Sequence, residues 1–180
     1  KILRKKDITV EVYDKLDDAL FTTISSIYKK YIKHKKFHEK DFEEESEFFK
    51  KEDNIDWKYF IYYFKNKPIA FTEIKVFQSN HVLTGQFGWD YENPKLGLGT
   101  YATLHEIDWS IKNKCKKYYL SFGYENTSLY KSRFDGFEFW NGRGWISNKS
   151  LYKKLCEHDT EINTLEELNI YQRKYFKLNG

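Results

Sequence analysis

Leu96-Gly97-Leu98-Gly99-Thr100-Tyr101 is the stretch that decides the fold, because it joins two sequence patterns of different period. Before it, residues 81–89 form a β-rich run, and after it, residues 98–113 carry apolar side chains at helical spacing. A glycine turn that leads from a strand into a helix leaves backbone N–H groups unpaired, and the helix dipole points at the same place. The turn therefore predicts an anion-binding site; the alternative is that its glycines serve only a tight turn.

The residues on either side of this turn predict a mixed sheet. Runs rich in β-branched and aromatic residues predict strands at 8–13, 59–64, 69–77 and 81–89. Residues 65–68 have the composition of a hairpin turn. After the helix, residues 118–122 form a short apolar run, which we expect to pair parallel to the strand before the glycine turn. The sequence thus predicts an edge strand, an antiparallel meander and a β-α-β unit.

Helical spacing of apolar residues predicts helices at 17–37, 39–51, 98–113, 126–134 and 164–176. Thr164 and Glu167 have the spacing of a capping box at the start of the last helix, and residues 137–146 predict a hairpin. The helix after the glycine turn has two apolar stripes, so we expect it to be covered on two sides: Tyr101, Leu104, Ile107, Ile111 and Cys115 form one, and Leu98, Ala102, His105 and Trp109 the other. We interpret His105 as a packed side chain.

Length and composition favour one α/β domain over residues 1–180, with a mixed twisted sheet flanked by helices. Of the 180 residues, 40% are hydrophobic and 19% aromatic, which suffices for one core. The formal charge of +4 is too small for a dedicated DNA-binding protein. No stretch is long and apolar enough to span a bilayer, and Cys115 and Cys156 lack the spacing of a zinc or disulfide motif. We therefore expect a cytoplasmic protein without a membrane partner.

Several short motifs surround the glycine turn. Asp90-Tyr91-Glu92 precedes it, and Leu104 with Glu106-Ile107 follows it inside the helix. Three further motifs lie elsewhere in the chain: Tyr28-Lys29-Lys30-Tyr31 with His34, Tyr118-Tyr119-Leu120, and Tyr130-Lys131 with Phe134. Together with the order of elements, these motifs resemble the GNAT superfamily, and within it the arginyl-tRNA and leucyl-tRNA protein transferases. The resemblance covers roughly residues 24–140 and implies a GNAT-like fold.

The resemblance implies an acyltransferase that moves an acyl group onto an amine. The favoured donor is aminoacyl-tRNA and the favoured acceptor is the amino terminus of a protein or peptide. Gly97 stands where this family usually has Ser, and the same Gly-x-Gly turn also resembles GNAT domains that use acyl-CoA. An acyl-CoA-dependent N-acyltransferase, with a protein, peptide or small-molecule acceptor, is therefore one alternative, and a non-catalytic binding module is another. Neither donor is a tightly bound cofactor.

The expected donor site is the turn itself, with Gly97, Leu98, Gly99, Thr100 and Tyr101 as donor-binding residues. Glycines let a phosphate approach the backbone, and the Thr100 hydroxyl adds a donor.

Acyl transfer needs a base for the amine, a polarised carbonyl and an acid for the leaving group, and it needs no metal. Glu73 and Asp90 are the expected catalytic bases, provided that burial raises the pKa of either carboxyl, and backbone N–H groups at a bulged strand are expected to stabilise the oxyanion. Trp89 and Glu92, which flank Asp90 and Tyr91, are expected to bind substrate. The alternative is that these carboxylates are ordinary surface charges.

Tyr130, in the predicted helix over 126–134, is the expected catalytic acid, and Lys131 and Arg133 are expected to bind a phosphate or an acidic acceptor. The resemblance places the Tyr-Lys segment in the substrate pocket. The alternatives are a packed tyrosine and a solvated pair of basic residues.

Residues 29–37 form the densest basic run and are interleaved with aromatic rings, as in a nucleic-acid contact. Acidic residues follow at 39–45, so two helical faces that neutralise one another are the favoured interpretation, and contact with a tRNA acceptor stem is the alternative. His34 and His38 have the spacing of a metal pair, but no third ligand adjoins them, so we expect no metal site.

Overall fold

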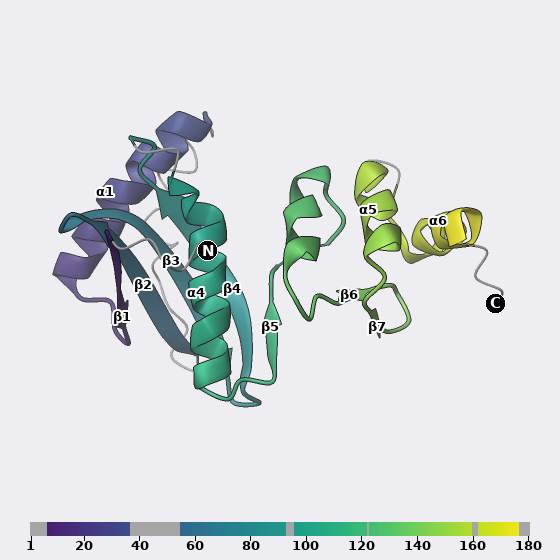
Figure 1. The fold of residues 1–180 in the computed structure, drawn as a ribbon, viewed down its shortest axis with the longest axis horizontal. Helices are drawn as coiled ribbons and strands as arrows, with labels where there is room; N and C mark the ends of the chain where they lie inside the picture. Colours follow the sequence, from purple (N-terminus) through teal and green to yellow (C-terminus); the bar gives the residue numbers. More distant parts are fainter. Residues whose placement is uncertain (1–6, 37–54, 93–95, 122, 160–161, 177–180) are drawn as a thin grey trace. The chain divides into compact units, whose positions relative to one another are not determined.

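The computed structural model describes residues 7–36, 55–92, 96–121, 123–159 and 162–176 (Figure 1). The predicted helix over 39–51 lies outside these residues. The chain divides into two compact units, residues 1–119 and 120–180. The expectation of one domain over residues 1–180 stays a prediction.

The first unit contains a five-stranded sheet in the order β1-β2-β3-β4-β5. Its strands are β1 (Ile8–Tyr13), β2 (Asp56–Phe64), β3 (Lys67–Phe77), β4 (His81–Trp89) and β5 (Lys117–Tyr119). The first four pair antiparallel in sequence order, and β5 pairs parallel to β4. Lys65 and Asn66 join β2 to β3 with φ values of 50° and 62°, as a two-residue hairpin turn requires. The predicted α/β class and mixed sheet are confirmed.

Helices α1 (Asp18–Lys35) and α4 (Leu98–Lys112) cover opposite faces of this sheet (Figure 1). Successive residues of a strand point to opposite faces. Accordingly, Tyr59 and Ile61 of β2 pack with the apolar residues of α1, whereas Phe60 and Tyr62 pack with those of α4. Asp17 fixes the start of α1, because its side chain accepts a hydrogen bond of 2.8 Å from the N–H of Leu20.

The prediction that α4 is covered on two sides is wrong. Ile111 is 70% exposed, whereas the polar residues Glu106 and Ser110 are buried. The buried face of α4 therefore includes two polar residues, and a search for apolar residues at helical spacing does not find them. His105 packs against the rings of Tyr101 and Tyr62, with centroids 4.5 Å and 6.1 Å away, and burial lowers its pKa.

The second unit is a smaller assembly of short elements around its own apolar cluster. Its elements are the 3₁₀ helix η3 (Asn126–Arg133), β6 (Phe139–Trp140), β7 (Trp145–Ile146), α5 (Lys149–Glu157) and α6 (Leu165–Phe176). The buried members of this cluster are Phe137, Phe139, Leu151, Tyr152, Leu155, Cys156 and Leu168. Strands β6 and β7 form the predicted hairpin in shortened form.

Side chains cap the N-termini of α5 and α6 in the second unit. The capping box of α6 is confirmed: Thr164 Oγ1 accepts from the N–H of Glu167 at 3.1 Å, and Glu167 Oε2 accepts from the N–H of Thr164 at 2.9 Å. Helix α5 was not predicted, although Asn148 caps it by accepting from the N–H of Leu151 at 3.0 Å. Among the described residues, no helix combines the length and apolarity needed to cross a membrane.

Candidate functional site

The glycine turn forms the start of α4. Gly97 has φ 60° and ψ 43°, in the left-handed region that favours glycine, and an added Cβ would meet no atom within 4 Å. Backbone conformation, rather than lack of space, therefore favours glycine here. The N-cap residue, Gly97, has no side chain to cap this helix, and the first turn of the helix has no acidic residue. The first N–H groups of the helix are thus available to an anionic ligand.

The predicted donor-binding residues divide into two kinds. Leu98 and Tyr101 are 1% and 2% exposed and belong to the core beneath α4, so they offer only backbone atoms to a ligand. Gly97 and Thr100 are exposed. Gly99 lies over the ring of Phe87 on β4, since a Cβ at this position would stand 3.7 Å from Phe87 Cε1. The turn therefore rests on the last part of β4.

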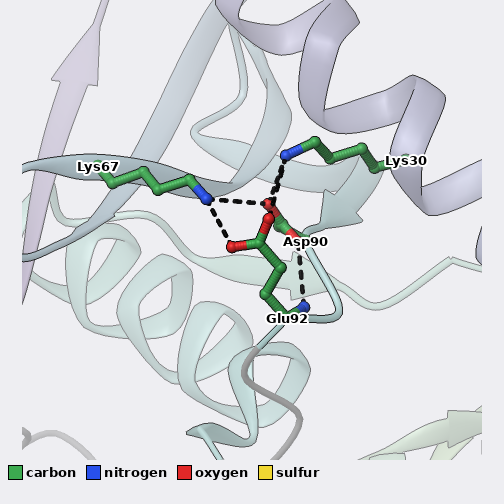
Figure 2. A network of polar contacts seen from close by, with 4 residues as sticks. All are labelled: Lys30, Lys67, Asp90 and Glu92. Carbon is green, nitrogen blue, oxygen red and sulfur yellow. Dashed lines mark hydrogen bonds and ion pairs between the residues drawn. The ribbon is translucent and has the colours of Figure 1, made fainter.

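Asp90 directly follows β4 and is the centre of a charged network (Figure 2). Its Oδ2 lies 2.8 Å from Lys30 Nζ of α1 and 3.8 Å from Lys67 Nζ of β3, and its Oδ1 accepts from the N–H of Glu92 at 3.0 Å. The Glu92 carboxylate lies 2.5 Å from Lys67 Nζ and 3.6 Å from Lys30 Nζ. The network joins α1, the start of β3 and the end of β4.

The electrostatics of Asp90 argue against a role as general base. Burial raises the pKa of its carboxyl, but the hydrogen bonds from Lys30 and from the Glu92 N–H, with the charges of Lys30 and Lys67, outweigh this effect. The pKa of Asp90 is therefore lowered, whereas a role as general base requires a raised pKa. The geometry instead suits an ion pair that fixes α1 to the end of β4.

An aromatic stack adjoins this network and was not predicted. The ring of Tyr91 lies 4.0 Å from that of Trp89 and 3.4 Å from that of His34, measured between centroids. Trp89, an expected substrate-binding residue, is half-buried in this stack. The other histidine of the predicted pair, His38, lies outside the described residues. Within the described part of the chain, no group of three or more His, Cys, Asp or Glu side chains is arranged to hold a metal ion.

Glu73 belongs to β3 and lies opposite a β-bulge in β4. Thr72 pairs with Phe87 and Ile74 with Thr84, so Gly85 and Gln86 together face Glu73. Glu73 is 4% exposed, and its Oε1 accepts a hydrogen bond of 3.3 Å from the N–H of Gln86. A Cβ on Gly85 would stand 2.7 Å from Glu73 Cγ, which explains glycine at this position. The expected base and the N–H group of a bulged strand are therefore direct partners.

The second half of β4 is an open edge within the first unit. Strand β5 pairs with β4 only through His81–Lys117, Val82–Tyr118 and Leu83–Tyr119. In the described part of this unit, residues 84–89 have no strand on that side. An unpaired edge presents N–H and C=O groups that an extended ligand can bind.

Glu106 carries a further buried carboxyl, for which the sequence predicts no role. Its carboxyl is buried and accepts hydrogen bonds from the Tyr118 hydroxyl and, at 3.4 Å, from the Thr84 hydroxyl. Burial raises its pKa to about 7, against the opposing effect of hydrogen bonds from Tyr118, Thr72 and Thr84. The available signal was a glutamate on the buried face of an apolar helix.

The remaining expected site residues lie together on η3 in the second unit. Tyr130 is 39% exposed and contacts the ring of Phe134 edge-on, with 6.4 Å between centroids. Lys131 is buried, and burial lowers its pKa, whereas Arg133 is exposed. Their action together with residues of the first unit stays a prediction.

The comparison with protein families identifies the chain. The family model "Arginine-tRNA-protein transferase, C terminus" matches residues 23–141, which is more than half of the chain. The chain belongs to this family. The match begins within α1 and includes the Asp90 network, the glycine turn, α4 and η3. The resemblance seen in the sequence is confirmed, and the predicted acyltransferase activity of this chain is a proposal.

Two solved structures are also similar to the chain. The ribosomal-protein-S18-alanine N-acetyltransferase from Escherichia coli is 18% identical with a TM-score of 0.41, over 59% of this chain and 63% of that one. A GNAT family acetyltransferase from Staphylococcus aureus is 16% identical with a TM-score of 0.45, over 65% of this chain and 87% of that one. The chain thus spans less than two thirds of the Escherichia coli protein. No curated protein matches the chain.

Proposed function

We propose that this chain transfers an aminoacyl group from aminoacyl-tRNA to the amino terminus of a protein or peptide. Membership of the arginine-tRNA-protein transferase family, over residues 23–141, is the observation that carries this proposal. The two unpaired cysteines, Cys115 and Cys156, fit a reducing compartment such as the cytoplasm.

The donor binds at the start of α4. The N–H groups of Leu98, Gly99 and Thr100 hold a phosphate of the donor, and the exposed Thr100 hydroxyl adds a hydrogen bond. The last turn of α1 supplies positive charge for the acceptor stem through Lys33 and Lys35, both exposed. The acidic residues that were expected to neutralise this turn lie outside the described residues.

The reaction takes place along the open edge of β4. The acceptor amine forms a bond to the acyl carbon, and the ester bond to the tRNA ribose breaks. Glu73, whose Oε1 accepts a hydrogen bond from the Gln86 N–H, takes the proton that the amine loses. An N–H group of the bulged strand that Glu73 does not occupy stabilises the oxyanion. Tyr130 stays the proposed acid for the leaving ribose oxygen. Asp90 anchors the site, and Lys131, Arg133, Trp89 and Glu92 remain the proposed substrate contacts.

An acyl-CoA donor is the second candidate, and the open edge of β4 favours it. Such a donor carries a pyrophosphate for the N–H groups at the start of α4 and amide groups for the unpaired backbone of residues 84–89. The acceptor would be a protein, a peptide or a small amine. The breaking bond is then carbon–sulfur, and the rest of the chemistry is unchanged.

Donor binding to the purified chain separates these functions. Radiolabelled aminoacyl-tRNA and acyl-CoA are each titrated into wild-type protein and two variants of the turn. Gly99→Asp adds a negative charge at the start of α4 and abolishes binding of the donor, whereas Gly99→Ala retains it, because a Cβ at this position has ordinary contacts. Wild-type affinity in Gly99→Asp overturns the donor site. Binding of acyl-CoA alone supports the second candidate, and binding of neither donor supports a non-catalytic module.

A further inference from the structure

The carboxyl of Glu106 lies where β4 separates from β5. The last paired residues are Leu83 and Tyr119, and Thr84 is the first residue of β4 beyond them. We call this point the fork, defined by Leu83, Thr84, Tyr118 and Tyr119. The bulge formed by Gly85 and Gln86 begins with the next residue. The geometry of the fork therefore determines where the N–H groups of the bulge lie.

One carboxyl group links both branches of the fork. Glu106 Oε2 accepts hydrogen bonds from the hydroxyl of Tyr118 on β5 and from that of Thr84 on β4. The Thr72 hydroxyl on β3 also donates to this carboxyl, and Thr72 Oγ1 lies 3.5 Å from the hydroxyl of Tyr62 on β2. Side chains from neighbouring strands thus meet at one residue of α4.

Burial of the Glu106 carboxyl costs free energy that an apolar side chain at this position would not cost. A buried carboxylate carries a desolvation penalty that apolar residues of similar volume avoid. Glu106 is 2% exposed and lies on the helix whose Leu98, Tyr101 and Ala102 belong to the apolar core. The hydrogen bonds supply directional contacts, which set the separation of the two strands more narrowly than apolar packing does.

We propose that Glu106 is a positioning residue that fixes the separation of the two strands at the fork, through Thr84 and Tyr118, and thereby sets the position of the bulge residues Gly85 and Gln86 relative to the reacting carbonyl. The catalytic part of this inference rests on the proposed function. The structural part, the control of the bulge by Glu106, does not depend on any substrate.

The protonation of Glu106 alters the fork. A carboxylate accepts all of these hydrogen bonds, whereas a carboxylic acid must donate one. The titratable groups that face it from the packed strands are Tyr118 and Tyr62, and burial raises the pKa of both, so both stay protonated. Because burial also raises the pKa of Glu106 to about 7, the fork changes its hydrogen bonding near neutral pH.

The first experiment compares Glu106→Gln with Asp108→Asn. Asp108 lies on the same helix but its carboxylate is 43% exposed and pairs with Lys112 at 2.6 Å, so it is a matched control. Hydrogen exchange of backbone amides is measured from pH 6 to pH 8. The protection factor of an amide is its intrinsic exchange rate at each pH divided by the measured rate. We expect Glu106→Gln to lower this factor at residues 84–86 at least threefold and to remove its pH dependence, without a change in the β2–β3 hairpin. Asp108→Asn leaves exchange unchanged.

The second experiment measures acyl transfer with the donor that binds. We expect Glu106→Gln to lower kcat at least tenfold with little change in the KM of the donor, and to flatten the pH profile of kcat near pH 7. Tyr118→Phe and Thr84→Val provide the test if Glu106→Gln does not fold. If no donor supports transfer, the proposed function fails, and amide exchange still decides the inference. Unchanged exchange at residues 84–86, or wild-type kcat and pH profile in all folded variants, overturns it.

Discussion

The ammonium of Lys30 on α1 lies 2.8 Å from the carboxylate of Asp90 at the end of β4. The two side chains differ in environment, because that of Asp90 is 5% exposed and that of Lys30 is 48% exposed. A helix on one face of the sheet is thereby joined to the residue from which the chain continues toward the glycine turn.

This ion pair predicts an effect on stability. We expect Lys30→Ala to lower the free energy of unfolding at pH 7 by about 1–2 kcal/mol, because it removes the closest partner of a buried carboxylate. Urea denaturation measures the change, and Lys33→Ala, at an exposed position of the same helix, is the control with a change near zero.

The same ion pair predicts a dependence of stability on pH. Because the pKa of Asp90 is lowered, its contribution to the free energy of unfolding is present above the ordinary pKa of 3.8 and is lost as the pH falls through the pKa of the folded state. Equal stability of Lys30→Ala and wild type at pH 7 contradicts the anchor.

Glu73 and Asp90 differ in their expected effect on turnover. Glu73→Gln removes the proposed base next to the bulge and lowers kcat by about 100-fold or more. Asp90→Asn retains a side chain of similar shape and changes kcat by less than about tenfold, since the lowered pKa makes Asp90 a poor base. Steady-state kinetics at a temperature where both variants are folded makes the comparison. A larger loss in Asp90→Asn than in Glu73→Gln reverses the assignment.

Glu106 predicts a pH-dependent stability difference. The unfolded chain loses this proton near pH 4.5 and the folded chain near pH 7, so the carboxyl stabilises the fold most below pH 4.5, and this contribution is lost as the pH rises to about 7. Glu106→Gln does not titrate. The stability of wild type relative to this variant should therefore fall by roughly 2–3 kcal/mol between pH 5 and pH 8. Denaturation curves at several pH values test this, and a difference that is constant with pH contradicts it.

Gly97 and Gly99 should respond differently to alanine. Gly97 has φ 60°, so Gly97→Ala destabilises the chain by about 1 kcal/mol through backbone strain. Gly99 lies within the α4 helix, and an added Cβ has ordinary contact with Phe87, so Gly99→Ala is neutral or slightly stabilising. Thermal unfolding of the two variants provides the measurement. The opposite order of stability would show that the turn has another backbone conformation.

Much of the first unit could be predicted from the sequence because its elements depend on local patterns. Alternation at 8–13, the hairpin turn at Lys65-Asn66 and the glycine turn gave the strands, their order and the helix that follows. Helix α5 was missed, although Leu151, Tyr152, Leu155 and Cys156 have helical spacing, because Asn148 was not interpreted as a cap. The signal was present in that segment.

The candidate site was less accessible to sequence analysis. Asp90 was singled out, but its pKa is set by Lys30 and Lys67, which are distant in sequence and meet it only in the fold. Glu106 has no local signature of its role, since its hydrogen bonds come from strands that precede and follow α4. Charge networks between separate elements determine these properties, and a pattern along the chain does not encode them.

Transfer of a radiolabelled aminoacyl group from aminoacyl-tRNA to the amino terminus of a peptide tests the central claim most directly. We predict that the purified chain labels the peptide, that Gly99→Asp abolishes labelling and that Gly99→Ala retains it. Labelling from acyl-CoA but not from aminoacyl-tRNA, or from neither donor, contradicts the account.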